Sequence, residues 1–153
     1  MQIEAISKRN FQLLVPLLGE YQKFYHTEPN RARNHRFIQR LMGNKRLGIQ
    51  FICIDQNGVG AGFATLYFLP SSLSAKNYCV LNDLYTRPDV RKQGVARKLI
   101  RVCTNYALSK GYGSIEWITE SRNKTAQRLY NQLGAIHSPW MYYRMPIDVG
   151  SSV

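Results

Sequence analysis

Two patterns of apolar residues adjoin in the middle of the chain. Residues 80–85 are mostly apolar, as in a buried strand, and Arg-Pro-Asp at 87–89 interrupts that run. From Val95 onward, apolar residues recur at the spacing of an amphipathic helix, at Leu99, Val102 and Tyr106. The sequence therefore predicts a buried strand that leads through a short turn into a helix.

The remaining patterns predict an α/β (α+β) fold with about six or seven strands and about four helices. Ser7 is expected to cap the first helix, which Pro16 should bend or interrupt unless it falls in the first turn. Asn57-Gly58 is a strong signal for a hairpin turn. The predicted strands are 2–6, 47–54, 59–69, 78–86, 114–119, 135–137 and 140–145, with a loop at 70–75. The predicted helices run from Ser7 through Leu18, from Pro29 to Gly43, from Val95 to about Ser109, and over 124–133.

Length and composition indicate one compact domain. The chain has 153 residues, of which 44% are hydrophobic, enough for one core but not for two. We expect a single domain over 1–147 and a C-terminal tail at 148–153. The sequence contains no run of 18 apolar residues and no hydrophobic signal region at its start, which favours a soluble, cytoplasmic protein without membrane contact. The three cysteines, Cys53, Cys79 and Cys103, lie in apolar contexts and are expected to be reduced and to bind no metal.

The formal net charge of +12 changes this picture. A strongly positive surface attracts anions, whether they are coenzyme phosphates, acidic substrates or nucleic acid. It disfavours a highly cationic acceptor such as a polyamine, because like charges slow encounter and weaken binding.

The turn before the central helix has the composition of a phosphate cradle, a name used below for residues 91–97. Gly94 and Ala96 leave the backbone uncovered, and the first amides of a helix have no partner within it. These amides and the helix dipole suit a phosphate group, as do the nearby basic residues Arg91, Lys92, Arg97 and Lys98. The alternative is a glycine at a tight helix start beside a solvated basic face. The pattern matches neither a Walker loop nor a dinucleotide fingerprint.

Two ordered motifs carry a family resemblance. Arg91-x-x-Gly94-x-Ala96 after the strand LNDLYT resembles the acetyl-CoA pyrophosphate motif of the GNAT superfamily of N-acetyltransferases, and the segment from Asn123 to Tyr130 resembles the second motif of that family. The stretch IEWITESRNKTAQRLYNQLGA is most similar to the branch that holds diamine, polyamine and fungal histone-type acetyltransferases. The resemblance implies the GNAT fold, a mixed and mostly antiparallel sheet whose central fourth and fifth strands splay apart to admit pantetheine.

The resemblance also implies the residues that would bind acetyl-CoA as a co-substrate. Main-chain groups of three strand residues would pair with the pantetheine arm, the cradle would hold the pyrophosphate, and Asn123 would bond the amide backbone of the coenzyme. Tyr130 would act as the catalytic acid, because a phenol with a pKa of roughly 10 stays protonated at neutral pH and can donate to the departing thiolate. The complete set expected at the coenzyme is Leu84, Tyr85, Thr86, Arg91, Lys92, Gln93, Gly94, Val95, Ala96, Arg97, Asn123, Ala126 and Tyr130.

An asparagine stands where the diamine-type pattern places a glutamate. That pattern has Leu-Glu-Asp on the fourth strand, whereas this chain reads Leu81-Asn82-Asp83. Strand alternation is expected to send the Asp83 side chain to the face opposite Asn82, so Asp83 does not simply substitute. Other candidates for the base are Glu116, Glu120, His26, His35 and His137, and each is as readily explained as an ordinary surface residue.

The leading hypothesis is an N-acetyltransferase that moves the acetyl group of acetyl-CoA to a primary amine, on a small molecule or a lysine side chain, by direct attack in a ternary complex. One alternative is a nucleic-acid- or ribosome-binding domain, but the basic residues are scattered rather than clustered with aromatic residues between them, which disfavours it. Another is a coenzyme-binding family member without turnover. The aromatic segment WMYYRM at 140–145 suggests a possible homodimer.

Overall fold

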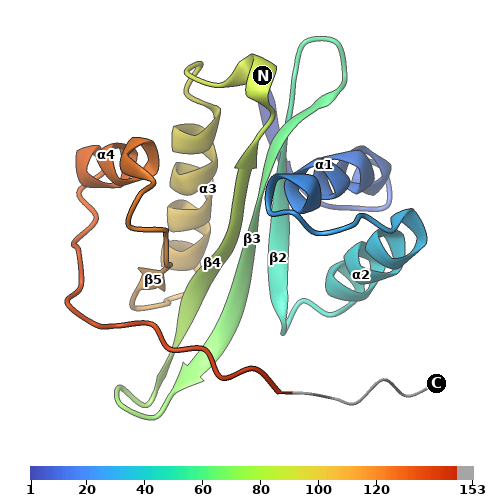
Figure 1. Cartoon of the computed structure of the whole chain (residues 1–153). Helices are drawn as coiled ribbons and strands as arrows, with labels where there is room; N and C mark the ends of the chain where they lie inside the picture. The colour runs from blue at the N-terminus through green and yellow to red at the C-terminus, as the bar shows by residue number, and fades with distance from the viewer. Residues whose placement is uncertain (148–153) are drawn as a thin grey trace. The chain divides into compact units, whose positions relative to one another are not determined.

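The computed structural model describes residues 1–147 and divides into two compact units, Met1–Glu120 and Ser121–Val153 (Figure 1). The predicted tail at 148–153 lies outside the described residues, and the single domain over 1–147 stays a prediction. No helix within residues 1–147 is both long and apolar enough to cross a membrane.

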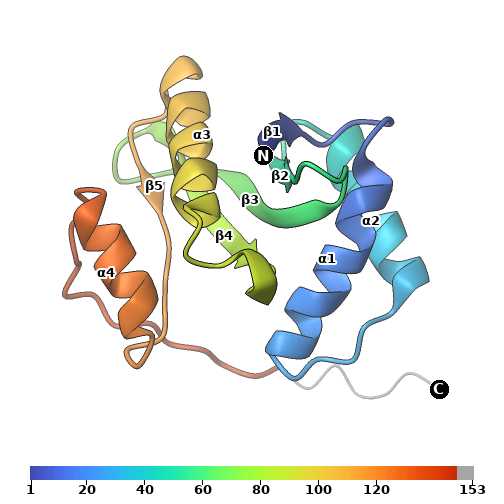
Figure 2. The ribbon, with the colours of Figure 1, turned by 90° about the horizontal axis from the view of Figure 1, so that it is seen from above.

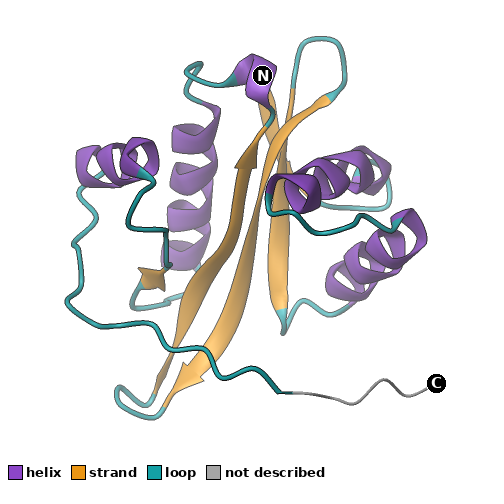
Figure 3. Ribbon diagram, viewed as in Figure 1, coloured by secondary structure: helices purple, strands orange, loops and turns teal. Residues whose placement is uncertain are grey.

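The first unit is built on a sheet of five strands in the order β1-β2-β3-β4-β5 (Figure 3). The first three pairings are antiparallel and the β4–β5 pairing is parallel, so the sheet is mixed and mostly antiparallel, as predicted. The Asn57-Gly58 turn joins β2 to β3, with Gly58 at a φ of 75°. The strands are β1 (Gln2–Ala5), β2 (Gly48–Ile54), β3 (Gly60–Ser71), β4 (Lys76–Thr86) and β5 (Ile115–Glu116).

Helices cover both faces of this sheet. Figures 1 and 2 show α1 (Phe11–Phe24) and α2 (Arg31–Gly43) on one face and α3 (Val95–Ser109) on the other. A short 3-10 helix, η1 (Pro88–Val90), separates β4 from α3, and α4 (Lys124–Gln132) belongs to the second unit. The four α-helices within residues 1–147 agree with the predicted number.

The two faces have separate cores because alternate residues of each strand point to opposite sides. On the α1 face, Leu14, Ile38, Ile52 and Phe63 are completely buried. On the α3 face, the ring of Tyr106 lies 5.7 Å from that of Phe51 and 5.9 Å from that of Phe68, and Leu99 and Cys103 are fully buried. Val95 and Leu99 lie four residues apart on the buried face of α3, as the apolar spacing predicts.

The start of α1 differs from the prediction. The helix begins at Phe11 after a turn, and Asn10 rather than Ser7 occupies the cap position. Asn10 is buried and its side chain bonds the main chain that precedes it, accepting from Ser7 N at 2.8 Å and donating to Ala5 O at 3.1 Å. These hydrogen bonds hold Asn10 against the end of β1, and the helix begins only after it. The helix then continues through the exposed Pro16, so the proline does not interrupt it. The bend that was the other predicted effect of Pro16 stays a prediction.

The predicted strands near the C-terminus were wrong or too long. β5 covers two residues in place of 114–119, and no strand is assigned within 135–147. These missing strands account for a sheet of five strands where six or seven were expected. A strand needs a hydrogen-bonded neighbour, which the local preferences of WMYYRM do not supply. The loop expected at 70–75 is shorter, because β3 extends through Pro70 to Ser71 and pairs there with β4.

β4 and β5 pair at one end only. Their register links Cys79 with Ile115 and Val80 with Glu116, and no further pair follows. From Leu81 to Thr86, β4 therefore has a strand neighbour on the β3 side alone. The splayed strand pair that the sequence resemblance implied is present in this form.

We predict that the α3 core contributes strongly to stability. Leu99 is completely buried and Leu108 on the same helix is 76% exposed. Leu99→Ala should lower the free energy of unfolding by about 2–5 kcal/mol through lost burial and the cavity that remains, measured by urea unfolding. Leu108→Ala is the matched control and should change it by less than about 0.5 kcal/mol. Equal effects of the two substitutions would contradict the arrangement of α3.

Candidate active site

A bulge in β4 places two polar side chains together. Thr65 of β3 pairs with Asp83, but its neighbour Leu66 pairs with Leu81, so Asn82 is an extra residue without a partner. Such a bulge interrupts strict alternation of side chains. The amide Nδ2 of Asn82 consequently donates to Oδ1 of Asp83 at 3.0 Å. The prediction that Asp83 points away from Asn82 was wrong for this reason.

Asp83 ends a row of buried polar residues that crosses three strands. Gln50 of β2 pairs with Thr65 of β3, which pairs with Asp83 of β4. These three residues, the polar row, are 3%, 0% and 8% exposed. Gln50 Nε2 donates to Thr65 Oγ1 at 3.1 Å, and the Thr65 hydroxyl interacts in turn with the Asp83 carboxyl. The row holds the carboxyl in place on the α1 face of the sheet.

Burial raises the pKa of Asp83, although hydrogen bonds from Thr65, Tyr21 and Asn82 to the carboxylate partly counteract it. Burial and the nearby Asp83 charge also raise the pKa of Tyr21 and of Tyr67. Both phenols therefore stay protonated at neutral pH. A carboxyl group with a raised pKa, held beneath a bulge, has the properties of a proton acceptor.

The phosphate cradle adopts the conformation that its glycine suggests. Gly94 has a φ of 80° and Lys92 a φ of 62°, both left-handed, so the chain turns tightly into α3. Lys98 N bonds Gly94 O at 3.0 Å, and the amides of Val95 and Ala96 before it have no acceptor within the helix. A Cβ atom at Gly94 would meet no other atom within 4 Å. The predicted cradle thus has exposed main chain at a helix start and open space beside it.

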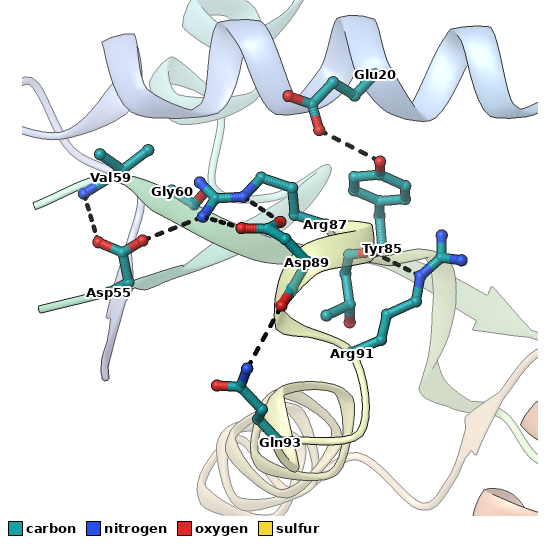
Figure 4. A network of polar contacts seen from close by, with 10 residues as sticks. Glu20, Asp55, Val59, Gly60, Tyr85, Arg87, Asp89, Arg91 and Gln93 are labelled. Atoms are coloured by element: carbon teal, nitrogen blue, oxygen red, sulfur yellow. Dashed lines mark hydrogen bonds and ion pairs between the residues drawn. The ribbon is translucent and has the colours of Figure 1, made fainter. Parts of the chain in front are cut away.

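Arg87 fixes the turn that carries the cradle (Figure 4). Its guanidinium donates to Asp89 at 2.7 and 2.8 Å, to Asp55 at 3.2 Å and to the carbonyl of Gly60 at 3.0 Å. Amides of the hairpin, above all that of Val59, lower the pKa of Asp55, and Arg87 lowers it further. One arginine therefore fastens η1 to the β2–β3 hairpin. This contribution was not anticipated from the sequence, because nothing local links Arg87 with Asp55.

The three predicted pantetheine-binding residues lie at the end of β4, on the part that has no β5 neighbour. Arg91 Nε donates to Thr86 O at 3.2 Å, and its guanidinium lies 5.6 Å from the ring of Phe24. The hydroxyl of Tyr85 donates to Glu20 at 3.3 Å (Figure 4). Leu84, Tyr85 and Thr86 thus lie next to the cradle. The Arg91 side chain folds back onto the end of the strand.

The remaining predicted coenzyme residues belong to the second unit. Asn123 caps α4, its Oδ1 accepting from Ala126 N at 3.1 Å. Ala126 and Tyr130 lie within the helix, and Gly134, with a φ of 81°, follows its end. The roles proposed for Asn123, Ala126 and Tyr130 stay predictions.

The other predicted bases have ordinary surroundings. Glu116 is exposed and accepts from the Ser114 hydroxyl at 3.2 Å. His35 lies against Gln12 and the ring of Phe11 on the exposed side of the helices. Glu120 is exposed and contributes, after burial, to the raised pKa of Tyr25. Only Asp83 combines a carboxyl group with deep burial among these candidates.

The model of the acetyltransferase (GNAT) family matches residues 13–135. The chain belongs to the GNAT acetyltransferase family. It is accordingly an N-acetyltransferase that uses acetyl-CoA as its co-substrate, which confirms the leading prediction. The match covers both motifs that carried the resemblance.

Individual relatives agree with this assignment. The N-acetyltransferase YhfO of Bacillus subtilis is 29% identical over 134 residues, covering 88% of this chain and 89% of the relative. Thialysine N-epsilon-acetyltransferase of Sus scrofa is 34% identical over 80 residues, and that match spans 52% of this chain and 46% of the relative. A solved structure of a probable acetyltransferase has a TM-score of 0.87 at 27% identity, covering 96% of this chain and 98% of the other. The predicted GNAT fold is therefore confirmed.

We predict opposite pH dependences for two carboxyl groups. Because burial raises the pKa of Asp83, the folded protein keeps this proton to higher pH than the unfolded chain, and stability declines as the pH rises through that range. Asp83→Asn removes this decline. The difference between the Tm of the variant and that of wild type, measured by calorimetry, should therefore shift in favour of the variant from about pH 4 to pH 8.

Asp55→Asn is the control of opposite sign, because the pKa of Asp55 is lowered. Its stabilising effect is present above the unfolded pKa and is lost as the pH falls through the folded one. The variant should therefore be less stable than wild type at neutral pH, with the difference shrinking below about pH 4. Parallel Tm curves for wild type and Asp83→Asn would show that Asp83 does not titrate abnormally.

Proposed function

We propose that this GNAT enzyme acetylates a small primary amine and that Asp83 is the base that receives the proton of the amine. The observation that carries the proposal is the bulge, which brings a buried carboxyl beside Asn82 on the α1 face of the sheet. This carboxyl supplies the group that was missing at position 82. An amine with a pKa near 10 is mostly charged at neutral pH, so it must lose a proton before it attacks a thioester.

The chain offers acetyl-CoA a binding site along β4 and the cradle. Main-chain groups of β4 beyond Val80 have no β5 partner and suit the amide-rich pantetheine arm as an added strand would. The open amides of the cradle and the positive end of α3 suit the pyrophosphate. Lys92, Gln93 and Arg97 flank these amides, and a ligand that approaches Gly94 meets no side chain there.

Acetyl-CoA supplies an acetyl thioester, and the residues of the chain move the protons. Asp83, directly or through one water, takes the proton of the ammonium group, and the neutral nitrogen then forms its bond to the acetyl carbon. The carbon–sulfur bond breaks, and Tyr130 donates its phenolic proton to the thiolate. Once bonded to the acetyl carbon, the nitrogen gives up its second proton, which returns through solvent to the Tyr130 phenolate. Asp83 releases the first proton to solvent, so one proton is liberated for each ammonium group that is acetylated.

The acceptor that we favour carries an anionic group as well as an amine. The net charge of +12 disfavours polycations, and the Sus scrofa relative is named for thialysine, an amino acid. We also propose that the enzyme descends from the branch that holds diamine, polyamine and fungal histone-type acetyltransferases. The sequence of the segment from Ile115 to Ala135 supports this proposal. A lysine side chain in a protein is the alternative acceptor.

Two further proposals concern the setting of the enzyme. We propose a cytoplasmic location, because the free cysteines Cys53, Cys79 and Cys103 are all buried, which suits a reducing compartment.

We propose that a second copy of the chain contacts an exposed aromatic segment near the C-terminus. Its residues, each at least 69% exposed, are Trp140, Met141, Tyr142 and Tyr143. Sedimentation of wild type and Tyr143→Asp tests the dimer directly.

We predict that the cradle is needed for acetyl-CoA binding but not for folding. Acetyl-CoA at ~100 times its dissociation constant should stabilise wild type by about 2.7 kcal/mol, seen as a Tm several degrees higher. Gly94→Glu should abolish this shift by crowding the phosphates. It should lower the Tm of the free protein only slightly, because the new Cβ meets open space and costs about 1 kcal/mol of backbone strain.

Gly111→Glu is the matched control, since Gly111 has a φ of 72° and open surroundings at the other end of α3. This variant should respond to acetyl-CoA as wild type does. Stabilisation by a nucleic-acid duplex in place of acetyl-CoA would favour the nucleic-acid-binding alternative. Binding of acetyl-CoA without thiol release from any amine would identify a member without turnover.

We predict that Asp83→Asn lowers kcat by ~10²–10³-fold, the range expected when a general base is lost. The acid limb of the pH profile of kcat/KM should disappear with it, because that limb reports ionisation of the base. Glu116→Gln is the control and should stay within about twofold of wild type, since Glu116 is an exposed surface residue. Thiol release across a panel of amines is the measurement. A large loss in Glu116→Gln with full activity in Asp83→Asn would assign the base to β5.

A further inference from the structure

A cavity of about 400 Å³ opens on the sheet face that carries Asp83. Its lining is mostly apolar and comes from three elements, which identifies it as a built pocket between helix and sheet. α2 packs against β2 and contributes one side, while β3 and β4 contribute the other. The lining residues used below are Phe37, Arg40, Leu41, Tyr67, Val80 and Asn82.

The register of β3 and β4 connects this cavity with the proposed base. Tyr67 pairs with Val80, and Thr65 pairs with Asp83 two residues away on the same face of β3. Asn82, the bulge residue, lines the cavity and also donates to the Asp83 carboxyl at 3.0 Å. An amine that reaches Asn82 from the cavity is therefore beside Asp83.

Charge distinguishes the two sides of the cavity. Arg40 is the only charged residue among those that line it, and within residues 1–147 the structure records no ion pair of its guanidinium. α2 carries four arginines, at positions 31, 33, 36 and 40, and has no acidic residue. The side formed by α2 thus attracts an anion. The side formed by β4 carries Asn82, whose amide bonds the Asp83 carboxyl group directly behind it.

We propose that this cavity is the acceptor site and that Arg40 binds a carboxylate at the end of the acceptor remote from its amine. The proposal rests on the acetyltransferase function proposed above and names the substrate class: an amino acid whose reacting amine and carboxylate are separated by an apolar chain. Phe37, Leu41, Tyr67 and Val80 contact that chain. A guanidinium suits a carboxylate because it forms two parallel hydrogen bonds with it.

The sheet gives the approximate length of the acceptor. α2 packs on β2, and Asn82 lies on β4, two strands away. Two strand spacings amount to roughly 10 Å. The ω-amino acid 6-aminohexanoate has an extended chain of that order, and hexylamine is its counterpart without the carboxylate.

The test compares these two amines in wild type, Arg40→Met and Arg36→Met. Arg36 lies one turn before Arg40 on the exposed side of α2 and does not line the cavity, so it is the matched control for charge. Wild type should prefer 6-aminohexanoate. Arg40→Met should raise its KM roughly tenfold or more, as expected for loss of a charge-assisted hydrogen bond, with hexylamine unchanged. Arg36→Met should alter neither by more than about twofold.

Titration calorimetry of 6-aminohexanoate with the three proteins provides a readout that does not need turnover. Loss of binding in Arg40→Met alone supports the carboxylate site even if the reaction is slow. Equal use of the two amines by wild type, or equal effects of Arg40→Met and Arg36→Met, would overturn this inference and leave the acetyltransferase proposal intact. Absence of thiol release with every amine, while 6-aminohexanoate still binds through Arg40, would instead overturn the proposed catalytic function.

Discussion

The single extra residue in β4 is the constraint on which the proposed chemistry depends. Without the bulge at Asn82, alternation would place Asp83 and Asn82 on opposite faces, and the β4 edge would offer no carboxyl group beside the acceptor cavity. With it, the carboxyl is buried on the α1 face and fixed by its bond to Asn82 and by the polar row. Burial destabilises the charged form of the Asp83 carboxyl and therefore raises its pKa. A raised pKa makes the carboxylate a better proton acceptor.

The proposed coenzyme and acceptor sites use complementary features of β4. Toward Thr86 the strand lacks a β5 neighbour and leads into the cradle, which the contacts of Arg87 fix to the β2–β3 hairpin. Toward Val80 the strand lines the cavity that ends at Arg40. The bulge lies between these two parts of the strand. One strand can therefore align a thioester on one side of the bulge with an amine on the other.

Local patterns predicted the parts of this arrangement that are local in origin. Gly94 and the apolar spacing from Val95 specify the turn and α3, and Asn57-Gly58 specifies the hairpin. The bulge was missed because it is a property of the register between β3 and β4, which no short sequence pattern encodes. Asp83 was consequently set aside as a base. The strands expected within 135–147 were overpredicted for the converse reason, since aromatic residues favour strands but do not provide a neighbouring strand. Arg40 was not singled out because its proximity to Asn82 exists only after α2 packs on the sheet.

The most direct measurement of the central claim is an NMR titration of the Asp83 side-chain carboxyl carbon, assigned by comparison with Asp83→Asn. A carboxyl group buried beneath the bulge must titrate above the unperturbed value of about 3.9, and the Asn82 side-chain amide resonances should shift in the same pH range because Nδ2 bonds that carboxyl. A carboxyl that titrates at or below that value, with no response from Asn82, would contradict both the bulge geometry and the assignment of Asp83 as the base.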